Sequence, residues 1–305
     1  MALSLRQRLV LLRITEPLVA GVVRAGFGLL RLLGPKLAPR IGAAVARSLG
    51  PLTSAHRIAT ENIRLAFPDR DAAWQAEVAR QAWDNLGRTV CEYVHLAAIW
   101  DLDLRAPEAG RVFCDAATAE RFVQLAEDGR GALVFAAHLA NWEMPAVAAH
   151  GAGLAAAVLY RTPNNKRIAA DILALRGPMM GRLISAGLLA PSRLAAALAE
   201  GLHVGMLVDQ RFGRGPRVMF LGRQASANPL LANLARRFDV PVHGTRAIRL
   251  PDGRIRLELT EAIPMPRDAT GAVDVALATQ AVNSVIEGWV REYPGQWLWM
   301  HRRWR

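Results

Sequence analysis

Apolar residues follow two different patterns along this chain of 305 residues. Between residues 51 and 110 they recur at helical spacing, as in Trp74, Val78 and Ala82. From about residue 111 short apolar runs alternate with helical segments. Strands that alternate with helices favour a sheet covered by helices on its faces. The pattern therefore predicts a helical segment over 51–110 followed by an α/β core over 111–305.

Five short apolar runs are predicted to form strands, over residues 132–137, 155–159, 204–208, 240–248 and 254–260. Helices are expected between the earlier ones, over 168–175, 193–200 and 229–238, with Ser192 capping the second and Gly201 ending it. Pro251-Asp252-Gly253 separates the last two strands and predicts a hairpin. The expected fold is thus α/β, with a mainly parallel, mixed central sheet flanked by helices.

Residues 1–50 are predicted to form basic amphipathic helices, divided at Pro17 and at Gly34-Pro35. At roughly 100° per residue, the side chains of Arg6, Arg13, Arg24 and Arg31 fall within about 20° of one another. Apolar residues fill much of the remaining circumference, as in helices that lie in an anionic membrane surface. The charge-free stretches are far shorter than the ~18 residues of a clean spanning helix. An ordinary surface helix packed on the body of the protein is the alternative.

The composition of the chain is compatible with several kinds of binding partner. The net charge is +12, and 52% of the residues are hydrophobic. A basic and apolar chain suits an anionic membrane, nucleic acid or an acidic protein. Cys91 and Cys114 lie far apart and have no metal-ligand spacing, so we expect no metal and a reducing compartment.

The stretch GALVFAAHLANWEMP, residues 131–145, contains the candidate chemistry. An apolar strand ends at His138, Asn141 can cap a following helix, and Glu143 would lie in its first turn. A turn between His138 and Glu143 would let them meet, with His138 as general base and a carboxylate on its other ring nitrogen. The alternative is a capping Asn, a surface Glu and a His that merely ends a strand.

Two further predicted strands also end in polar residues, Tyr160-Arg161 and Asp209-Gln210-Arg211. Ligands of open α/β sheets bind beyond the carboxyl ends of the strands, so these residues are expected to share a rim with His138. Arg161 would position an anionic group or stabilise an oxyanion. Asp209 would orient Arg161 or a neighbouring loop, or simply cap a turn.

Other polar segments leave more than one interpretation open. Arg211, Arg214, Arg217 and Arg223 lie among glycines in a loop that suits phosphate recognition, docking of an acidic protein, or plain solvation. Arg88 and Glu92 have the spacing of a solvated helical ion pair. The C-terminal Trp and Arg residues suit a membrane headgroup layer or nucleic-acid stacking, although Trp297 or Trp299 is expected in the core.

Several of these segments together resemble the late acyltransferases of lipid A biosynthesis, the lauroyl/myristoyl acyltransferase family, which is related more distantly to glycerolipid acyltransferases. The resemblance runs from about Ser54 to the end of the chain. It rests on these matches: the H-x-x-x-x-[DE] pattern of His138 and Glu143, Tyr160-Arg161 with Asn164-Asn165, Asp209-Gln210 with Gly213, the ending Gln296-Trp297-Leu298-Trp299-Met300-His301-Arg302-Arg303, and the preface Arg57, Glu61-Asn62 and Phe67-Pro68.

The resemblance implies transfer of a fatty acyl chain from acyl carrier protein to a hydroxyl of a lipid A precursor, at the cytoplasmic face of a bacterial inner membrane. His138 would be the base and Glu143 its partner. Arg161, Asn164, Asp209, Gln210, Arg211 and Arg214 are expected to bind substrate or the oxyanion. No cofactor, no metal and no acyl-enzyme are expected, because no Ser or Cys nucleophile is placed at the site.

The sequence departs from the family pattern at Arg211 and in the segment from Gln224 to Asn228, which lacks an expected threonine. These departures leave other acceptors open, namely lyso-phospholipids, ornithine lipids and phosphatidylinositol mannosides. Acyl-coenzyme A remains an alternative donor. A non-catalytic membrane-binding or nucleic-acid-binding protein is the rival from another class; the acyltransferase interpretation expects no nucleic acid.

Overall fold

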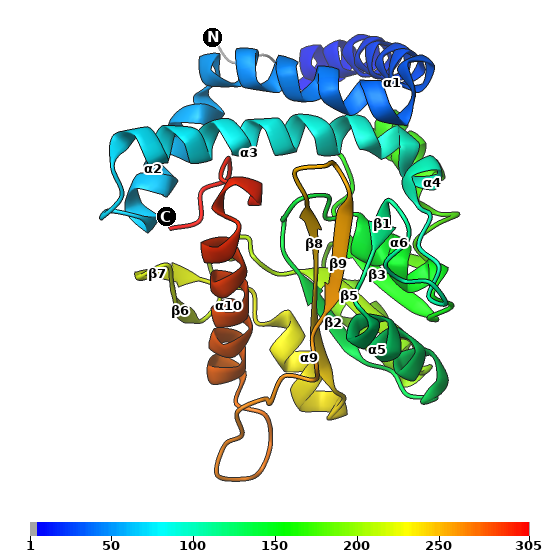
Figure 1. Cartoon of the computed structure of the whole chain (residues 1–305), viewed down its shortest axis with the longest axis vertical. Coiled ribbons are helices and arrows are strands. Elements are labelled where there is room, and N and C mark those ends of the chain that lie inside the picture. Colours follow the sequence, from blue (N-terminus) through cyan, green and yellow to red (C-terminus); the bar gives the residue numbers. More distant parts are fainter. Residues whose placement is uncertain (1–4, 305) are drawn as a thin grey trace.

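The computed structural model describes residues 5–304, and the side chains from residue 15 onward. Its centre is a seven-stranded sheet in the order β1-β9-β8-β2-β5-β3-β4. Helices cover both faces, and the helices α1 and α3 lie across one end of the sheet (Figure 1). The predicted α/β class with a mixed, mainly parallel sheet is confirmed.

Each of the five predicted strands is present. They are β2 (Leu133–Ala136), β3 (Ala156–Tyr160), β5 (His203–Leu207), β8 (Val242–Arg249) and β9 (Ile255–Leu259). Strands β8, β2, β5 and β3 are parallel to one another, whereas β8 and β9 form the expected antiparallel hairpin. Four short strands were missed: β1 (Val112–Phe113), β4 (Arg182–Ser185), β6 (Arg217–Phe220) and β7 (Arg223–Ser226).

The helices of the core are α5 (Ala116–Glu127), α6 (Met144–Gly151), α7 (Lys166–Arg176), α8 (Ala190–Ala199), α9 (Leu230–Phe238) and α10 (Val275–Glu292). The three helices predicted between the strands correspond to α7, α8 and α9, and α6 follows the turn after His138, whereas α5 and α10 were not predicted. The prediction that Ser192 caps α8 was wrong. Helix α8 begins two residues earlier, with Pro191 in its first turn, and the Ser192 hydroxyl donates back to the Leu189 carbonyl.

The helical segment before the core contains α2 (Ser54–Ala66), α3 (Ala72–Glu92), α4 (Leu96–Ile99) and the short 3-10 turns η1 (Gly50–Leu52) and η2 (Tyr93–His95). The interpretation of Glu92 as part of a solvated pair with Arg88 was wrong. Arg88 pairs with Asp84 instead, and Glu92 is fully buried. Its carboxylate accepts from Arg249 at 2.6 and 2.7 Å, which ties α3 to the end of β8.

Helix α1 (Leu5–Leu49) is kinked at Gly34, whose φ of 73° lies in the left-handed region. The expected division at Gly34 is therefore present, whereas Pro17 lies inside the helix without breaking it. Arg24 forms an ion pair with Asp171 of α7, and Arg31 is exposed. The Arg6 and Arg13 side chains lie outside the described part.

Helix α1 exposes many large apolar side chains. They are Leu18, Val19, Val22, Leu29, Leu32, Leu37, Ile41, Val45 and Leu49. Within the described chain, residues Thr15–Leu52 form the one segment long and apolar enough to cross a membrane. An 18-residue window within this segment has a mean hydropathy of 1.4 although charged residues interrupt it. This helix is compatible with a membrane anchor as well as with a helix that lies on the surface.

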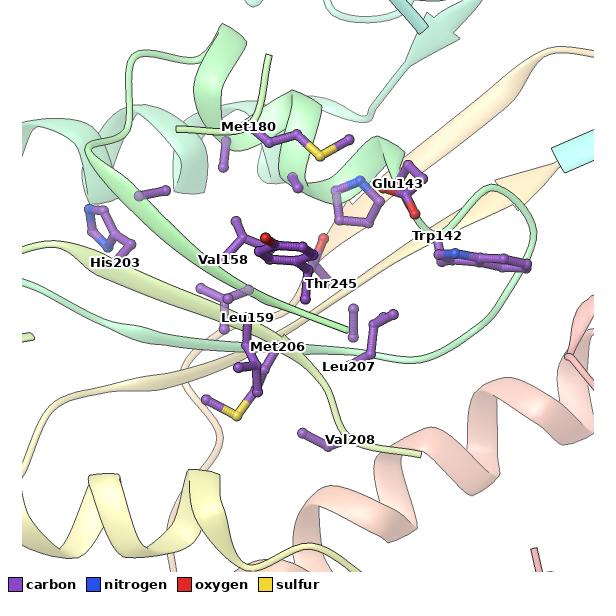
Figure 2. A pocket seen from close by; sticks show the side chains of 18 of the residues that line it. Trp142, Glu143, Val158, Leu159, Met180, His203, Met206, Leu207, Val208 and Thr245 are labelled. Atoms are coloured by element: carbon purple, nitrogen blue, oxygen red, sulfur yellow. The ribbon is translucent and has the colours of Figure 1, made fainter. Parts of the chain in front are cut away.

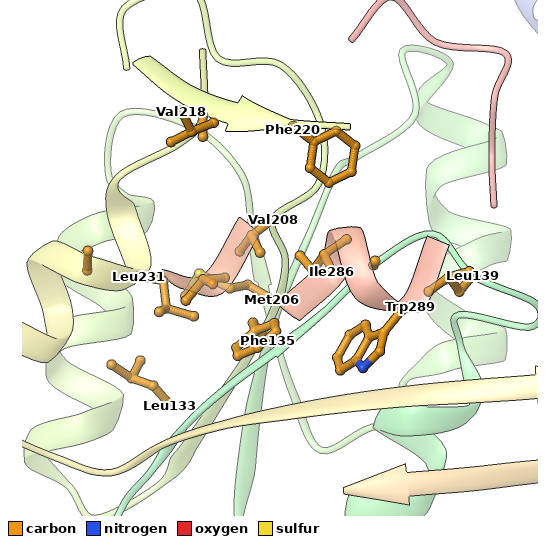
Figure 3. Packing of buried hydrophobic residues seen from close by; sticks show 14 of the residues in the cluster. Leu133, Phe135, Leu139, Met206, Val208, Val218, Phe220, Leu231, Ile286 and Trp289 are labelled. Carbon is orange, nitrogen blue, oxygen red and sulfur yellow. The ribbon is translucent and has the colours of Figure 1, made fainter. Parts of the chain in front are cut away.

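The two faces of the sheet pack into separate cores. Phe135, Met206 and Val208 point toward α9 and α10, where Leu231, Ile286 and Trp289 meet them (Figure 3). On the other face Phe122 of α5 and Met144 of α6 belong to a second cluster. Because side chains alternate along a strand, the residues between those of the first core face this second side.

Helices α1 and α3 touch most closely at two glycines. An added Cβ at Gly42 would overlap the Cys91 sulfur and the Gly87 carbonyl oxygen, whereas one at Gly26, also in α1, would meet no atom within 4 Å. We therefore expect Gly42→Ala to lower the free energy of unfolding by about 1–3 kcal/mol through overpacking. Gly26→Ala should leave it unchanged or raise it by about 0.5–1 kcal/mol. Urea unfolding of both variants in one detergent measures the difference, and equal stabilities would contradict the close packing.

Candidate active site

His138 follows β2 and begins a tight turn that buried groups hold from several sides. The His138 carbonyl accepts from the Leu298 amide at 3.0 Å, and the Ala140 amide donates to the Gln296 carbonyl at 3.0 Å. Ala140 has a φ of 44°, which is strained for a residue with a side chain. Its carbonyl accepts from Asn85 and Thr89 of α3. The C-terminal segment and α3 together fix the direction of the His138 ring.

The carboxylate beside the His138 ring is Asp209 rather than Glu143. Nδ1 of His138 lies 2.8 Å from Oδ1 of Asp209, and the His138 amide donates to Oδ2 at 2.9 Å. The Trp297 indole N–H also donates to Oδ2, at 2.8 Å. Asp209 follows β5, which neighbours β2 in the sheet. The sequence predicted that both residues lie at the same edge of the sheet. It predicted that Asp209 orients Arg161 or a neighbouring loop, or caps a turn, and not that it contacts His138.

The charges of this pair support each other. Burial alone would raise the pKa of Asp209, but the His138 ring and amide hold it well below its ordinary value. Burial likewise acts to lower the pKa of His138, yet the Asp209 charge and hydrogen bond, with a smaller contribution from Glu143, leave it raised. Asp209 therefore stays ionised and holds the proton of the imidazole on Nδ1. Nε2, which has no hydrogen-bond partner among the side chains described from residue 15 onward, is left to receive a proton.

Glu143 instead pairs with Arg176, the last residue of α7. The Arg176 Nε and Nη2 atoms lie 3.0 and 2.5 Å from the two Glu143 oxygens. The guanidinium also lies over the Tyr93 and Tyr160 rings. The expected helix starts later than the sequence suggested, since α6 begins at Met144 and Glu143 is its N-cap. Asn141 accepts from the Glu143 amide and donates to Glu92, so it fixes the turn and not the helix itself.

A deep groove of about 460 Å³ opens beside His138. Its floor is the sheet face formed by alternate residues of β2, β3 and β5, such as Ala136, Val158 and Gly205. Helices α5 and α6 contribute apolar side chains above this floor. Figure 2 shows Trp142 and Glu143 at one end of the pocket and His203 at the other. His203 and Asp209 are six residues apart, which corresponds to ~20 Å of extended strand and gives the approximate length of the groove along β5.

The far end of the groove is apolar except for His203. This residue is 6% exposed, and its Nδ1 has no hydrogen-bond partner. Burial lowers the pKa of His203, so its ring is neutral. Gly205 lies one step along the same strand face, and a Cβ there would meet only Val158 Cγ2, at 3.8 Å. The absence of a side chain at Gly205 keeps the middle of the groove open.

The other predicted site residues divide into two groups. Arg161, Gln210 and Arg211 line the groove near His138. Asn164 and Arg214 are exposed and do not line it. Within residues 5–304 no cluster of three or more His, Cys, Asp or Glu residues has the arrangement of a metal site. Both Cys91 and Cys114 are buried free thiols.

Sequence reasoning missed several residues that shape the site. Arg176 gave no signal because it ends an ordinary amphipathic helix. One of Trp297 and Trp299 was expected in the core and both are buried, but the hydrogen bond from the Trp297 indole to Asp209 was not foreseen. The view of the tail arginines as interfacial was wrong for Arg303. It is fully buried and donates to Asn283 and to the Ser226 carbonyl.

Removing the Asp209 charge should lower the pKa of His138. In Asp209→Asn the raising influence is lost, while burial continues to lower the pKa of the ring. We expect NMR titration of His138 to show a shift to lower pH, relative to the wild type. The matched control is Glu143→Gln, which should shift it in the same direction by less. An unchanged His138 titration in Asp209→Asn would contradict the observed pair.

Comparison with known proteins identifies the family of the chain. No curated protein sequence matched the chain. The family model described as bacterial lipid A biosynthesis acyltransferase matches residues 6–305. That match spans both the helical segment and the α/β core, including His138, Glu143 and the C-terminal tryptophans. The chain therefore belongs to the bacterial lipid A biosynthesis acyltransferase family.

Proposed function

We propose that this acyltransferase moves a fatty acyl chain from an acyl carrier protein thioester to a hydroxyl of a lipid A precursor, with His138 as general base. The observation that supports this most directly is the His138–Asp209 pair at the mouth of an apolar groove. Membership of the family gives the reaction class and the lipid acceptor. The carrier-protein donor and the residue roles are our proposal.

In the proposed mechanism Nε2 of His138 takes the proton of the acceptor hydroxyl, whose oxygen attacks the thioester carbonyl. A C–O bond forms and the C–S bond breaks. The proton on His138 passes to the departing thiolate, so the histidine is restored. Asp209 stabilises the imidazolium and holds its tautomer throughout. The groove lining contains no Ser or Cys among the described residues, which agrees with direct transfer.

Two arginines have separate proposed roles. Arg161 is exposed at the groove mouth, where it would stabilise the oxyanion or an anionic part of the substrate, together with amides of the turn after His138. Arg176 is neutralised by Glu143, so we assign this pair to shaping the mouth and not to proton transfer. Glu143 thus becomes a positioning residue in place of the predicted partner of the base.

The acceptor would approach from a membrane surface. Helix α1 exposes apolar residues, and it contacts α7, whose last residue, Arg176, lines the groove. We propose that α1 anchors the protein to the cytoplasmic face of the inner membrane, either by lying on it or by crossing it. A hydroxyl of a lipid in that leaflet would then lie close to His138.

An acyl-transfer assay read by mass spectrometry tests the proposal. Purified protein is mixed with carrier-protein thioesters and a bacterial lipid extract. We expect a new acylated lipid with the wild type, none above background with His138→Ala, and a rate reduced by about 10²–10⁴-fold with Asp209→Asn.

Two controls make this result specific. Glu143→Gln should retain more activity than Asp209→Asn, since it loses only the pair with Arg176. Product mass identifies the acceptor, so an acylated ornithine lipid or lyso-phospholipid would replace the lipid A precursor in the proposal. Equal rates for wild type and His138→Ala, or a stable acyl-protein adduct, would refute the mechanism.

The groove also predicts which residue limits the chain length of the donor. Gly205→Leu should fill the middle of the groove and shift the donor preference toward shorter acyl chains. Gly205→Ala should keep the wild-type preference, because its Cβ has room. The ratio of kcat/KM for dodecanoyl and hexanoyl donors measures the shift independently of protein yield. An unchanged ratio in Gly205→Leu would place the acyl chain elsewhere.

A further inference from the structure

A stretch of the chain beyond the active site has basic residues and no acidic ones. Residues 210–238 contain no Asp or Glu, whereas arginine occurs at Arg211, Arg214, Arg217, Arg223, Arg236 and Arg237. The sequence alone left phosphate recognition, protein docking and solvation open for this region. The structure shows that its central part is the hairpin β6–β7, not a loop.

This hairpin is held rigidly on the body of the protein. Leu221 and Gly222 both have positive φ, as the two central residues of a type I′ turn require. Gln280 of α10 donates to the Met219 carbonyl and accepts from its amide. The Leu221 amide donates to Glu287, also of α10. The hairpin thus presents its exposed side chains from a fixed backbone.

At its turn the hairpin borders a second cleft, with a volume of about 1130 Å³. Helix α2, the C-terminal segment and residues Gly222, Arg223 and Gln224 line it. Arg57, Arg223 and Arg302 line the cleft, are exposed, and form no ion pair within the described chain. Arg64 is also in the lining but is paired with Glu61. The cleft therefore has an excess of positive charge that nothing in its own lining neutralises.

The other end of the hairpin lies at the active-site groove. Arg211, which precedes β6, forms an isolated β-bridge with Ala227, which follows β7. Arg211, Phe212 and Asn228 line the groove. Each strand of the hairpin has four residues, which corresponds to ~13 Å of extended chain. A partner seated on the cleft would therefore lie within reach of a flexible arm that delivers a thioester to His138.

We propose that this cleft and the hairpin, defined by Arg57, Arg217, Arg223 and Arg302, form the docking surface for the acidic carrier protein that donates the acyl chain. The inference rests on the proposed function, since it concerns the same donor. Complementary charge would hold the carrier at the cleft while its prosthetic arm follows the hairpin to the groove.

A bilayer fits this surface less well than a protein does. Half of the large exposed apolar side chains of the described residues lie on α1, Met219 is exposed on the hairpin, and none of them lines the cleft. Helices that bind in a membrane interface combine basic residues with exposed apolar ones. An acidic protein surface needs only the charges.

The test compares two donors that share a thioester but differ in the protein. The triple variant Arg57→Glu/Arg223→Glu/Arg302→Glu is assayed with an acyl carrier protein thioester and with the corresponding acyl-pantetheine. Arg193→Glu, at an exposed position of α8 with no ion pair among the described residues, is the matched control. None of the three substituted arginines lines the active-site groove.

We expect the triple variant to raise KM for the carrier thioester about tenfold or more with little change in kcat, because like charges then face each other. Its KM for acyl-pantetheine should match the wild type, as should both values for Arg193→Glu. Direct binding of the unloaded carrier, measured by biolayer interferometry, should weaken in parallel and lose its dependence on salt.

Three results would overturn the inference. The first is an unchanged KM for the carrier in the triple variant. The second is an equal loss with both donors, which would indicate damage to the site itself. The third is loss of binding to anionic lipid vesicles with carrier binding intact, which would assign the surface to the membrane. Failure of the wild type to use either donor would contradict the proposed function and is distinguishable from these.

Discussion

The buried carboxylate of Asp209 is the group on which the arrangement of the site depends. It is fully buried and accepts from the His138 ring, the His138 amide and the Trp297 indole. A buried carboxylate without such donors would be strongly destabilising, so each of these groups is required by the others. The Trp297 contact couples the C-terminal segment, far away in the sequence, to the end of β5. The geometry of the His138–Asp209 pair and the packing of the C-terminal segment therefore depend on each other.

A second buried charge supports the same turn from the other side. Glu92 binds Arg249 and also accepts from Asn141, three residues after His138. The helical segment thus contributes to the shape of the site through α3. Ala140, in its strained conformation, lies between these two networks. Strain of this kind persists only where the surroundings determine it fully, which is the case here.

The positions of groove, hairpin and α1 give the molecule a functional layout. Apolar residues on one face of the sheet form the groove, and the His138–Asp209 pair lies where the parallel strands end. The apolar helix α1 lies at the same end, and the basic hairpin extends away from the groove mouth. Under the proposed function, the lipid acceptor and the protein-bound donor would reach His138 from different sides. This separation suits a reaction that joins a membrane substrate to a soluble one.

The local pattern was sufficient for much of the fold. An apolar run such as that of β2 is buried whichever elements pack against it. The Pro251-Asp252-Gly253 turn predicts the β8–β9 hairpin from the turn preferences of its own residues. Short strands such as β1 and β4 were missed because two to four residues have no periodicity to recognise, and their pairing comes from neighbouring strands. The polar strand ends at His138 and Asp209 were recognisable for a similar reason, since parallel strands present their carboxyl ends on one rim.

The sequence by itself determined that His138 would stand at the end of a buried strand beside other polar strand ends. Only the tertiary structure decided which carboxylate it meets. Glu143 is near in sequence, but the turn directs it to Arg176, while neighbouring strands bring Asp209 to the imidazole. Likewise Glu92 and Arg303 have the sequence pattern of solvated charges but are buried. Arg249, 157 positions away, pairs with Glu92, and the Ser226 carbonyl, 77 positions away, accepts from Arg303. The position of a buried charged group depends on its partner, and the spacing of residues along the sequence does not predict a partner that is distant in the chain.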